Sequence, residues 1–310
     1  MRNDAWSPGA LVARIDTHPE FKEVYVEGED DMGLVQWFLE QNGIENVVVY
    51  PIDSVDITEE LSAACGVSHL DRNSNRTDVI TLALLLQREV PAAAERITCM
   101  ADADLHHCFP ETYDSVFLVF TDYTSMEMYA FRSDLITKLL RVAAPSFPCS
   151  GEEVLTAMTG VLESLFGLRA ANYRLKWGLK WIRLDKDLKF KDRAIEFDEA
   201  SFVQKYLNTK GRTRYLEAFQ NEVANVRASF GPDHRLQIRG HDFTELLTDY
   251  LRKAAYSSFK DLTENQLRNN LFSQLQIAGL ISEPLFVKLL QKYHLVQDAA
   301  TTSPPIAEVN

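Results

Sequence analysis

The chain has 310 residues and a net charge of −13, with 46% apolar and 25% charged residues. This length fits one large or two modest domains with a real core, and the negative charge argues against a protein that coats nucleic acid non-specifically. The sequence has no apolar run of about 18 residues and no signal-peptide core, and its four cysteines are too widely spaced for a zinc or disulfide framework, so we expect a cytoplasmic protein without a membrane span.

In the first half of the chain, short apolar strands alternate with helices. We expect strands at 23–27, 46–50, 97–101 and 116–120, and helices at 31–41 and 76–89. Asp31 is predicted to cap the first helix and Gly43 to end it, while Pro51 is expected to stop the second strand. Such alternation predicts an α/β fold with a mainly parallel sheet that is flanked by helices.

A segment rich in Pro, Ser and Gly at 143–151 predicts a linker. We therefore expect an α/β domain at 1–142, a mostly helical domain with a small β-hairpin at 152–296, and a disordered tail at 297–310. Helix starts in the second half are predicted from capping patterns. These begin at Ser150 with Glu153, Asp198, Asp242 with Glu245, Thr263 with Gln266, and Ser282.

Acidic side chains follow two of the predicted strands at their carboxyl ends. Glu27 and Gly28 follow the first strand, and Asp102 and Asp104 follow the third. Because alternate residues of a strand point the same way, the two aspartates are expected to share a face. Ligands of parallel sheets bind outside the carboxyl ends of the strands, where carboxylates suit Mg²⁺ and Gly28 would permit a tight turn and a close phosphate. The alternative is that acids are simply common in exposed loops.

The segments Glu27-Gly28-Glu29-Asp30-Asp31 and Asp102-Ala103-Asp104 resemble the TOPRIM domain, the catalytic fold of topoisomerases, primases and overcoming-lysogenization-defect (OLD) nucleases. More narrowly, 121–129, Asn75-Arg76 and 239–243 resemble the TOPRIM-containing DUF4435 family. That family includes the TOPRIM effector of the PARIS anti-phage system, which pairs with an ATPase. The resemblance covers most of the chain.

The resemblance implies that Glu27, Asp102 and Asp104 are catalytic and bind Mg²⁺ or Mn²⁺, and that Glu127 completes the metal shell. It also implies a toxic nuclease of phage defence, with tRNA or other RNA favoured over DNA, that is restrained by an ABC-type ATPase and forms a homodimer when active. The chain departs from the common TOPRIM pattern after Asp104, where many members carry a glycine and this chain has 105–108, Leu-His-His-Cys.

Other residues are candidates for phosphate or nucleic-acid contacts. Asp30, Arg76 and His241 are candidates for the surroundings of the metal site or for phosphate binding, and each has the alternative of an ordinary solvated or capping role. The basic residues after 168 are candidates for nucleic-acid binding, with a solvated hairpin as the alternative. The candidates in that segment are Arg174, Lys176, Lys180 and Arg183. The aromatic residues among them, at 173, 177 and 181, favour a helical core stripe over base stacking.

The leading hypothesis is thus a metal-dependent nuclease. One alternative is a haloacid-dehalogenase-like phosphatase, which also uses Asp-x-Asp at a strand end, although there the pair usually follows the first strand of the domain. A second alternative is a non-catalytic adaptor of a defence complex that kept the fold for binding, against which the intact acids argue.

Overall fold

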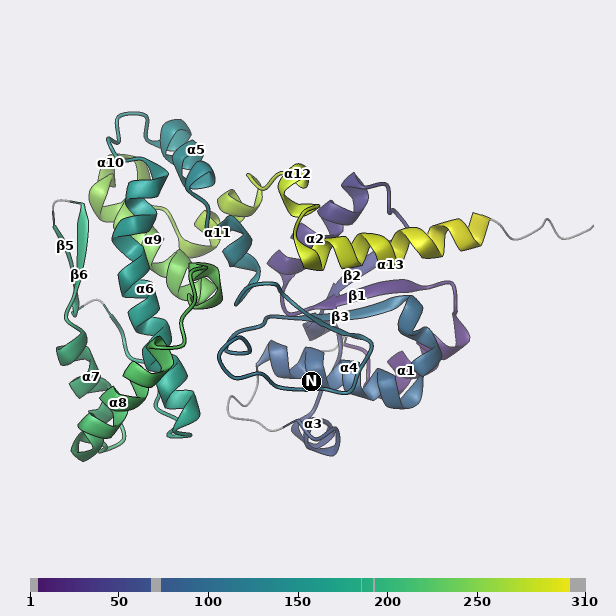
Figure 1. Cartoon of the computed structure of the whole chain (residues 1–310). Helices are drawn as coiled ribbons and strands as arrows, with labels where there is room; N and C mark the ends of the chain where they lie inside the picture. The colour runs from purple at the N-terminus through teal and green to yellow at the C-terminus, as the bar shows by residue number, and fades with distance from the viewer. Residues whose placement is uncertain (1–4, 68–73, 185, 192, 302–310) are drawn as a thin grey trace, which may run out of the picture. The chain divides into compact units, whose positions relative to one another are not determined.

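The computed structural model describes residues 5–67, 74–184, 186–191 and 193–301 (Figure 1). Its internal contacts divide the chain into two compact units. The first unit comprises Met1–Asp102, Thr112–Asp122 and Gln276–Asn310, and the second comprises Ala103–Glu111 and Tyr123–Leu275. The segment 143–151, predicted to link two domains, instead joins two helices of the second unit, and the carboxyl-terminal helix belongs to the first.

The first unit contains a four-stranded sheet in the order β2-β1-β3-β4. The strands are β1 (Lys22–Val26), β2 (Val47–Pro51), β3 (Ile97–Ala101) and β4 (Leu118–Phe120). All three pairings are parallel, which confirms the predicted α/β class with a parallel sheet. Contrary to expectation, Pro51 is the last residue of β2, a position that an edge strand tolerates because no ladder hydrogen bond is needed there.

Helices cover both faces of this sheet (Figure 1). The described α-helices of the unit are α1 (Pro8–Thr17), α2 (Glu29–Gln41), α3 (Glu59–Ala64), α4 (Asn75–Glu89), α12 (Ile277–Leu280) and α13 (Pro284–Thr301). On one face, α1 and α4 bury their apolar side chains against β1 and β3. On the other face, α2 and α13 pack together, and the ring centroids of Phe38 and Phe286 lie 4.6 Å apart.

Several helix ends differ from the predicted ones. Gly28, not Asp31, is the N-cap of α2, so the helix starts two residues early and Asp31 lies in its first turn. Gly43, with φ +75°, follows the end of this helix as predicted. α1 was not predicted, and α13 continues to Thr301, into the first part of the predicted tail. The rest of that tail, 302–310, lies outside the described residues.

The second unit is mostly helical and has a small antiparallel hairpin, as predicted. Its α-helices are α5 (Ser133–Ala143), α6 (Gly151–Arg174), α7 (Glu199–Asn208), α8 (Leu216–Arg227), α9 (Gly240–Ala254), α10 (Tyr256–Phe259) and α11 (Glu264–Phe272), and its strands are β5 (Leu188–Lys191) and β6 (Ala194–Phe197). Capping boxes form at the starts of α6 and α11, and Asp198 caps α7, as predicted.

Helix α6 runs through the middle of the second unit, with α5, α8 and α9 packed around it (Figure 1). Among the described helices it alone is long and apolar enough to span a membrane, but 61% of its most apolar stretch is buried. This is the burial of a core helix in a folded unit.

Substitution of Gly151 by Ala should destabilise the second unit, because Gly151 lies against the backbone of α5. An added Cβ would collide with the carbonyl oxygen of Ser133 and lie 2.6 Å from the backbone nitrogen of Thr137. We expect the free energy of unfolding to fall by roughly 1–3 kcal/mol, a typical cost of overpacking. Gly160 of the same helix is the matched control, since an added Cβ meets nothing there within 4 Å. Gly160→Ala should instead stabilise by up to about 1 kcal/mol. Equal effects in urea denaturation would contradict the close packing.

Lys292 should make stability depend on alkaline pH. Its Nζ donates to the carbonyl oxygen of Ile97 at 2.6 Å, and burial lowers the pKa of Lys292 to about 8. Because the unfolded chain holds this proton up to about pH 10.4, the unfolded state binds more protons between the two values, and stability should rise with pH there. In Lys292→Met this rise should be smaller by on the order of 1 kcal/mol. Parallel stability curves for the two proteins between pH 8 and 10.5 would refute the assignment.

Candidate active site at the edge of the parallel sheet

The carboxyl edge of the sheet has a topological switch point between β1 and β3. From β1 the chain crosses to β2 on one side and later returns to β3 on the other. Loops at such a point diverge, and the crevice that they leave is the usual ligand site of an open parallel sheet. Glu27 directly follows β1 and Asp102 directly follows β3, so the structure brings these two predicted site residues to the switch point.

Hydrogen bonds join the two strand ends. Glu27 Oε1 accepts from the backbone N–H of Asp102 at 2.7 Å. The first two residues of α4 add to this contact: Asn75 Nδ2 donates to the carbonyl oxygen of Glu27 at 2.6 Å, and Arg76 Nε donates to that of Asp102 at 2.8 Å. The side chain of Asn75 is a contributor that was not predicted, since its motif position pointed only to a helix start.

Arg76 was predicted as a phosphate contact, and the structure shows that it also has an internal role. Besides its bond to Asp102, its guanidinium lies 5.5 Å from the centroid of the Phe120 ring. The arginine is only partly exposed. It holds the backbone of Asp102 at the end of β3 and brings a positively charged side chain to that strand end.

The amino terminus of α2 meets the same edge directly after Glu27. Its N-cap, Gly28, has φ −145°, which is extended backbone, so the tight turn expected of this glycine is not formed. An added Cβ would make only an ordinary contact, 3.8 Å from Asp31 Oδ2. The space around Gly28 therefore does not require a glycine. With glycine as the N-cap, no side chain hydrogen-bonds to the backbone N–H groups of the first turn of α2. Asp30, the candidate for an outer-shell acid, lies in that first turn and is partly exposed.

A third acid of this edge, Asp122, was not predicted. It lies just beyond β4, and its two carboxylate oxygens accept from the backbone N–H of Leu285 at 3.1 and 3.0 Å. Asp122 therefore binds the first turn of α13. Its position after a strand is the same signal that drew attention to Glu27 and Asp102.

Asp104 belongs to the second unit, and the strand alternation used to predict its direction does not reach it. β3 ends at Ala101, and Asp104 adopts φ +47°, with its N–H donating to the carbonyl oxygen of Thr124 at 2.8 Å. The left-handed region costs most L-residues about 1–2 kcal/mol, but Asp and Asn adopt it more readily.

Asp104→Ala should consequently lower the free energy of unfolding by roughly 1 kcal/mol, whereas Asp104→Asn should change it by less than about half as much. Chemical denaturation of the two variants checks this order. Equal stabilities would contradict the left-handed conformation. Because Asp104→Asn should disturb the fold less than Asp104→Ala, Asn is the better substitution for testing whether the Asp104 carboxylate contributes to activity.

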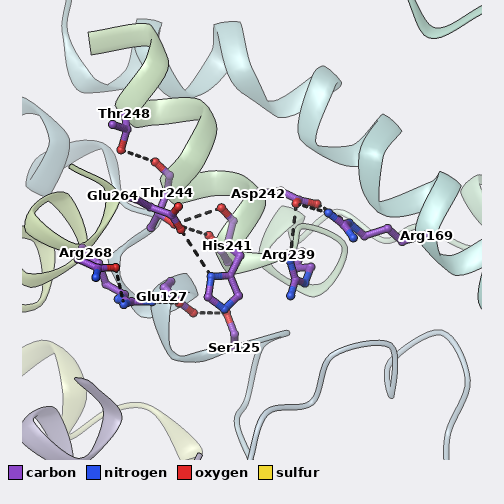
Figure 2. Close-up of polar contacts among 12 residues, drawn as sticks. Ser125, Glu127, Arg169, Arg239, His241, Asp242, Thr244, Thr248, Glu264 and Arg268 are labelled. Carbon is purple, nitrogen blue, oxygen red and sulfur yellow. Dashed lines mark hydrogen bonds and ion pairs between the residues drawn. The ribbon is translucent and has the colours of Figure 1, made fainter. Parts of the chain in front are cut away.

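Glu127, the predicted fourth metal ligand, belongs to a buried network of the second unit (Figure 2). Its side chain lies in a short 3-10 helix, η3 (Met126–Ala130), and the residue is 7% exposed. Ser125 Oγ donates to Glu127 Oε2 at 2.6 Å, and Arg268 Nη1 lies 3.6 Å from Glu127 Oε1. An added Cβ on Gly240 would collide with Ser125 Oγ and with Glu127, so the start of α9 packs directly on this network.

His241 and Asp242 follow Gly240 at the start of α9 (Figure 2). The imidazole of His241 is exposed, and its Nδ1 lies 3.5 Å from Glu264 Oε1. This hydrogen-bonding partner raises the pKa of His241. Asp242 does not cap the helix as predicted. Arg239 is the N-cap, and the buried carboxylate of Asp242 accepts from Nε and Nη2 of Arg169 at 2.9 and 2.7 Å.

The basic segment after α6 forms no helical stripe. α6 ends at Arg174, and the two tryptophans beyond it pack individually, Trp177 against Phe219 and Trp181 against Phe202. Among the predicted nucleic-acid contacts, Arg174 pairs with a glutamate, its Nε lying 3.1 Å from Glu222 Oε1. The other three, Lys176, Lys180 and Arg183, are exposed. Both tryptophans pack against aromatic rings but are only partly buried, and the predicted helical core stripe is not formed.

The donor set at the sheet edge suits a hard divalent cation. Among the residues that the structure describes, no three His, Cys, Asp or Glu side chains gather closely enough to hold a metal ion by themselves. Mg²⁺, however, is commonly held by one or two carboxylates, with waters and substrate phosphates completing the shell. Glu27 and Asp102, on adjacent strand ends, match that requirement.

Comparison with known proteins adds no assignment: the chain matches no protein-family model, and no curated protein is significantly similar to it.

Proposed function

We propose that the chain is a metal-dependent nuclease whose active site is the switch point between β1 and β3. The observation that carries the proposal is the direct hydrogen bond from the Asp102 N–H to Glu27 Oε1 at 2.7 Å. It joins two carboxylate-bearing strand ends at the position where open parallel sheets bind their ligands.

Each residue of this edge has a distinct part in the proposed reaction. Glu27 and Asp102 would hold Mg²⁺ or Mn²⁺. When bound, the ion would polarise a phosphoryl oxygen and make a bound water acidic enough to attack at neutral pH. Alternatively to binding the ion, Glu27 would act as the general base that takes a proton from the attacking water. Arg76 would attract and orient the phosphate, whereas the partial positive charge at the start of α2 is offset by Glu29, Asp30 and Asp31 in its first turn.

The choice of nucleic acid as substrate rests on the TOPRIM resemblance of the residues at 27–31 and 102–104. The narrower DUF4435 resemblance supports a further part of the proposal, a defence effector that cleaves tRNA or other RNA under the control of an ABC-type ATPase. Asp104 and Glu127 keep their place in this proposal as candidate further acids, although Glu127 also serves the internal network of the second unit.

Cleavage assays with the purified chain test the proposal. Single-stranded RNA, tRNA, single-stranded DNA and duplex DNA are incubated with Mg²⁺ or Mn²⁺, and matched samples contain EDTA. We expect cleavage of at least one polymer that disappears in EDTA. A chain that hydrolyses only a generic phosphomonoester would point instead to a phosphatase, and inactivity on every polymer, both alone and with an ATPase encoded beside it, would refute the nuclease.

A further inference from the structure

Two segments of the second unit carry many basic residues and no acidic ones, in a chain whose net charge is −13. Residues 173–184 contain four Lys or Arg and no Asp or Glu, and residues 200–216 contain another four and again no acid. The segments are distant in sequence, so their composition alone does not predict that they meet.

The structure brings the two segments together through aromatic rings. Trp177, in the turn after α6, lies with its ring centroid 5.8 Å from that of Tyr215, at the end of the 3-10 helix η4 (Thr213–Tyr215). The guanidinium of Arg212 lies 4.9 Å from the centroid of Trp177, and that of Arg214 lies 4.7 Å from the centroid of Tyr215. Cations and rings therefore alternate on one small surface, which we call the Trp177–Tyr215 platform.

The outer parts of the platform are accessible. Tyr215 is 37% exposed, a large fraction for an aromatic ring in this chain, and Arg214 is exposed beside it. Lys176, next to Trp177 in the chain, and Lys210, two residues before Arg212, are exposed as well. Trp177 is half-buried, because its inner face stacks on Phe219 at 5.7 Å. Trp177 thus anchors the platform, while Tyr215 and Arg214 present it to solvent.

Charge pairing leaves the platform positive. Arg174 pairs with Glu222 and Lys205 with Asp187, whereas among the residues that the structure describes no ion pair joins the four cations nearest the rings in the chain, Lys176, Lys210, Arg212 and Arg214, to an acid. Helix α8 begins directly after the platform, and its N-cap, Tyr215, gives the first turn no side-chain hydrogen bond. The partial positive charge of that helix start adds to the field of the basic side chains, although Glu217 in the same turn weakens it.

We propose that the Trp177–Tyr215 platform binds single-stranded nucleic acid. An exposed ring can stack on a base only where the base is not already stacked in a duplex, and flanking cations can then contact the phosphates. Trp, Tyr and Arg are also the residues of protein interfaces, but two acid-free segments in an acidic chain favour a polyanion. The inference deepens the proposed nuclease function, on which it rests for its biological meaning, by naming where a substrate strand is held.

Fluorescence anisotropy tests the platform with labelled oligo(U), oligo(dT) and a duplex of the same length. The background variant is Glu27→Gln, so that no substrate is cleaved during the titration. We expect both single strands to bind more tightly than the duplex. Tyr215→Ala should weaken binding about tenfold, in line with the loss of one stacked base, and Tyr215→Trp should retain it. Arg212→Ala with Arg214→Ala should reduce the slope of log affinity against log salt by about 1.4.

Lys253→Ala is the matched control. Lys253 is an exposed basic residue of the same unit whose Nζ lies 3.9 Å from the ring centroid of Phe190, outside both acid-free segments. Its loss should leave binding unchanged. Thermal unfolding of every variant separates lost binding from lost folding.

The outcomes distinguish this inference from the proposed function. Three results would overturn the platform, even if the chain cleaves nucleic acid. The first is wild-type affinity in both Tyr215→Ala and the double arginine variant, the second is equally weakened binding in Lys253→Ala, and the third is no binding of any single strand. Preference for the duplex would overturn its single-strand character. If the platform variants lose binding but the chain shows no metal-dependent cleavage, the platform would be supported and only the proposed nuclease function would be refuted.

Discussion

Glu27→Gln and Asp102→Asn should each reduce metal-dependent cleavage by at least about a hundredfold, while the protein remains folded. Each substitution removes one negative charge from the proposed cation site and keeps the size of the side chain. The glutamine oxygen can still accept from the Asp102 N–H, the bond that joins the strand ends at 2.7 Å. Stability should therefore change by less than about 1 kcal/mol, within the usual value of one hydrogen bond.

Two further variants make this result specific. Glu29→Gln removes a charge from the same acidic run, but Glu29 is exposed in the first turn of α2, so activity should stay near the wild-type value. Glu27→Ala removes the side-chain acceptor of the hydrogen bond from the Asp102 N–H. The free energy of unfolding should therefore fall by roughly 1–3 kcal/mol, and activity should be lost as well. If Glu27→Gln or Asp102→Asn cleaved as fast as wild type, the proposed active site would be wrong.

Arg169→Met should destabilise the second unit by roughly 3–5 kcal/mol, the cost of leaving a buried charge without its partner. The Asp242 side chain is only 2% exposed and accepts two hydrogen bonds from Arg169. The Arg169 guanidinium also lies 3.6 Å from the ring centroid of Trp181, so its loss removes a cation–π contact as well. Arg239 remains 3.8 Å from Asp242 and is expected to offset a small part of this cost.

The chain offers a matched exposed pair as the control. Arg132 also donates two hydrogen bonds to one carboxylate, that of Asp134, at 3.1 and 2.9 Å, but the two side chains are 41% and 60% exposed. Arg132→Met should therefore cost no more than about 1 kcal/mol. Replacing both Arg169 and Asp242 by apolar residues should recover much of the loss, because no buried charge then remains. Urea denaturation measures all four proteins, and similar costs for the two arginine substitutions would contradict the role given to burial.

The parallel sheet of the first unit could be predicted from the sequence because its signals are local, whereas α1 was not predicted and α13 was expected in the other domain. Short β-branched runs, helices of suitable length and acids at strand ends were enough to predict a parallel sheet and the meeting of Glu27 with Asp102. Errors arose where two local signals competed. Asp31 and Asp242 are residue types that often cap helices, yet the caps are Gly28 and Arg239, and each aspartate is the third residue of its helix, within the first turn.

The contacts of the second unit could not be predicted in the same way, because they depend on long-range packing. Nothing near Glu127 in the sequence indicates that Ser125, Gly240 and Arg268 will enclose it. Likewise, the four-residue spacing of the aromatics around Trp177 suggested a helix, but α6 ends at Arg174 and the ring is held by residues from α8 and the turn before it. The left-handed conformation of Asp104 is a further property that only the three-dimensional structure reveals.

Binding of Mn²⁺, followed by electron paramagnetic resonance, tests most directly the claim that Glu27 and Asp102 form a cation site. In the wild-type protein we expect saturable Mn²⁺ binding that Mg²⁺ displaces, and weaker binding by at least about tenfold in Glu27→Gln and in Asp102→Asn. Glu29→Gln should bind as wild type does. If the Glu27 and Asp102 variants bound Mn²⁺ as tightly as the wild-type protein, the metal site would lie elsewhere and the account of the sheet edge would be contradicted.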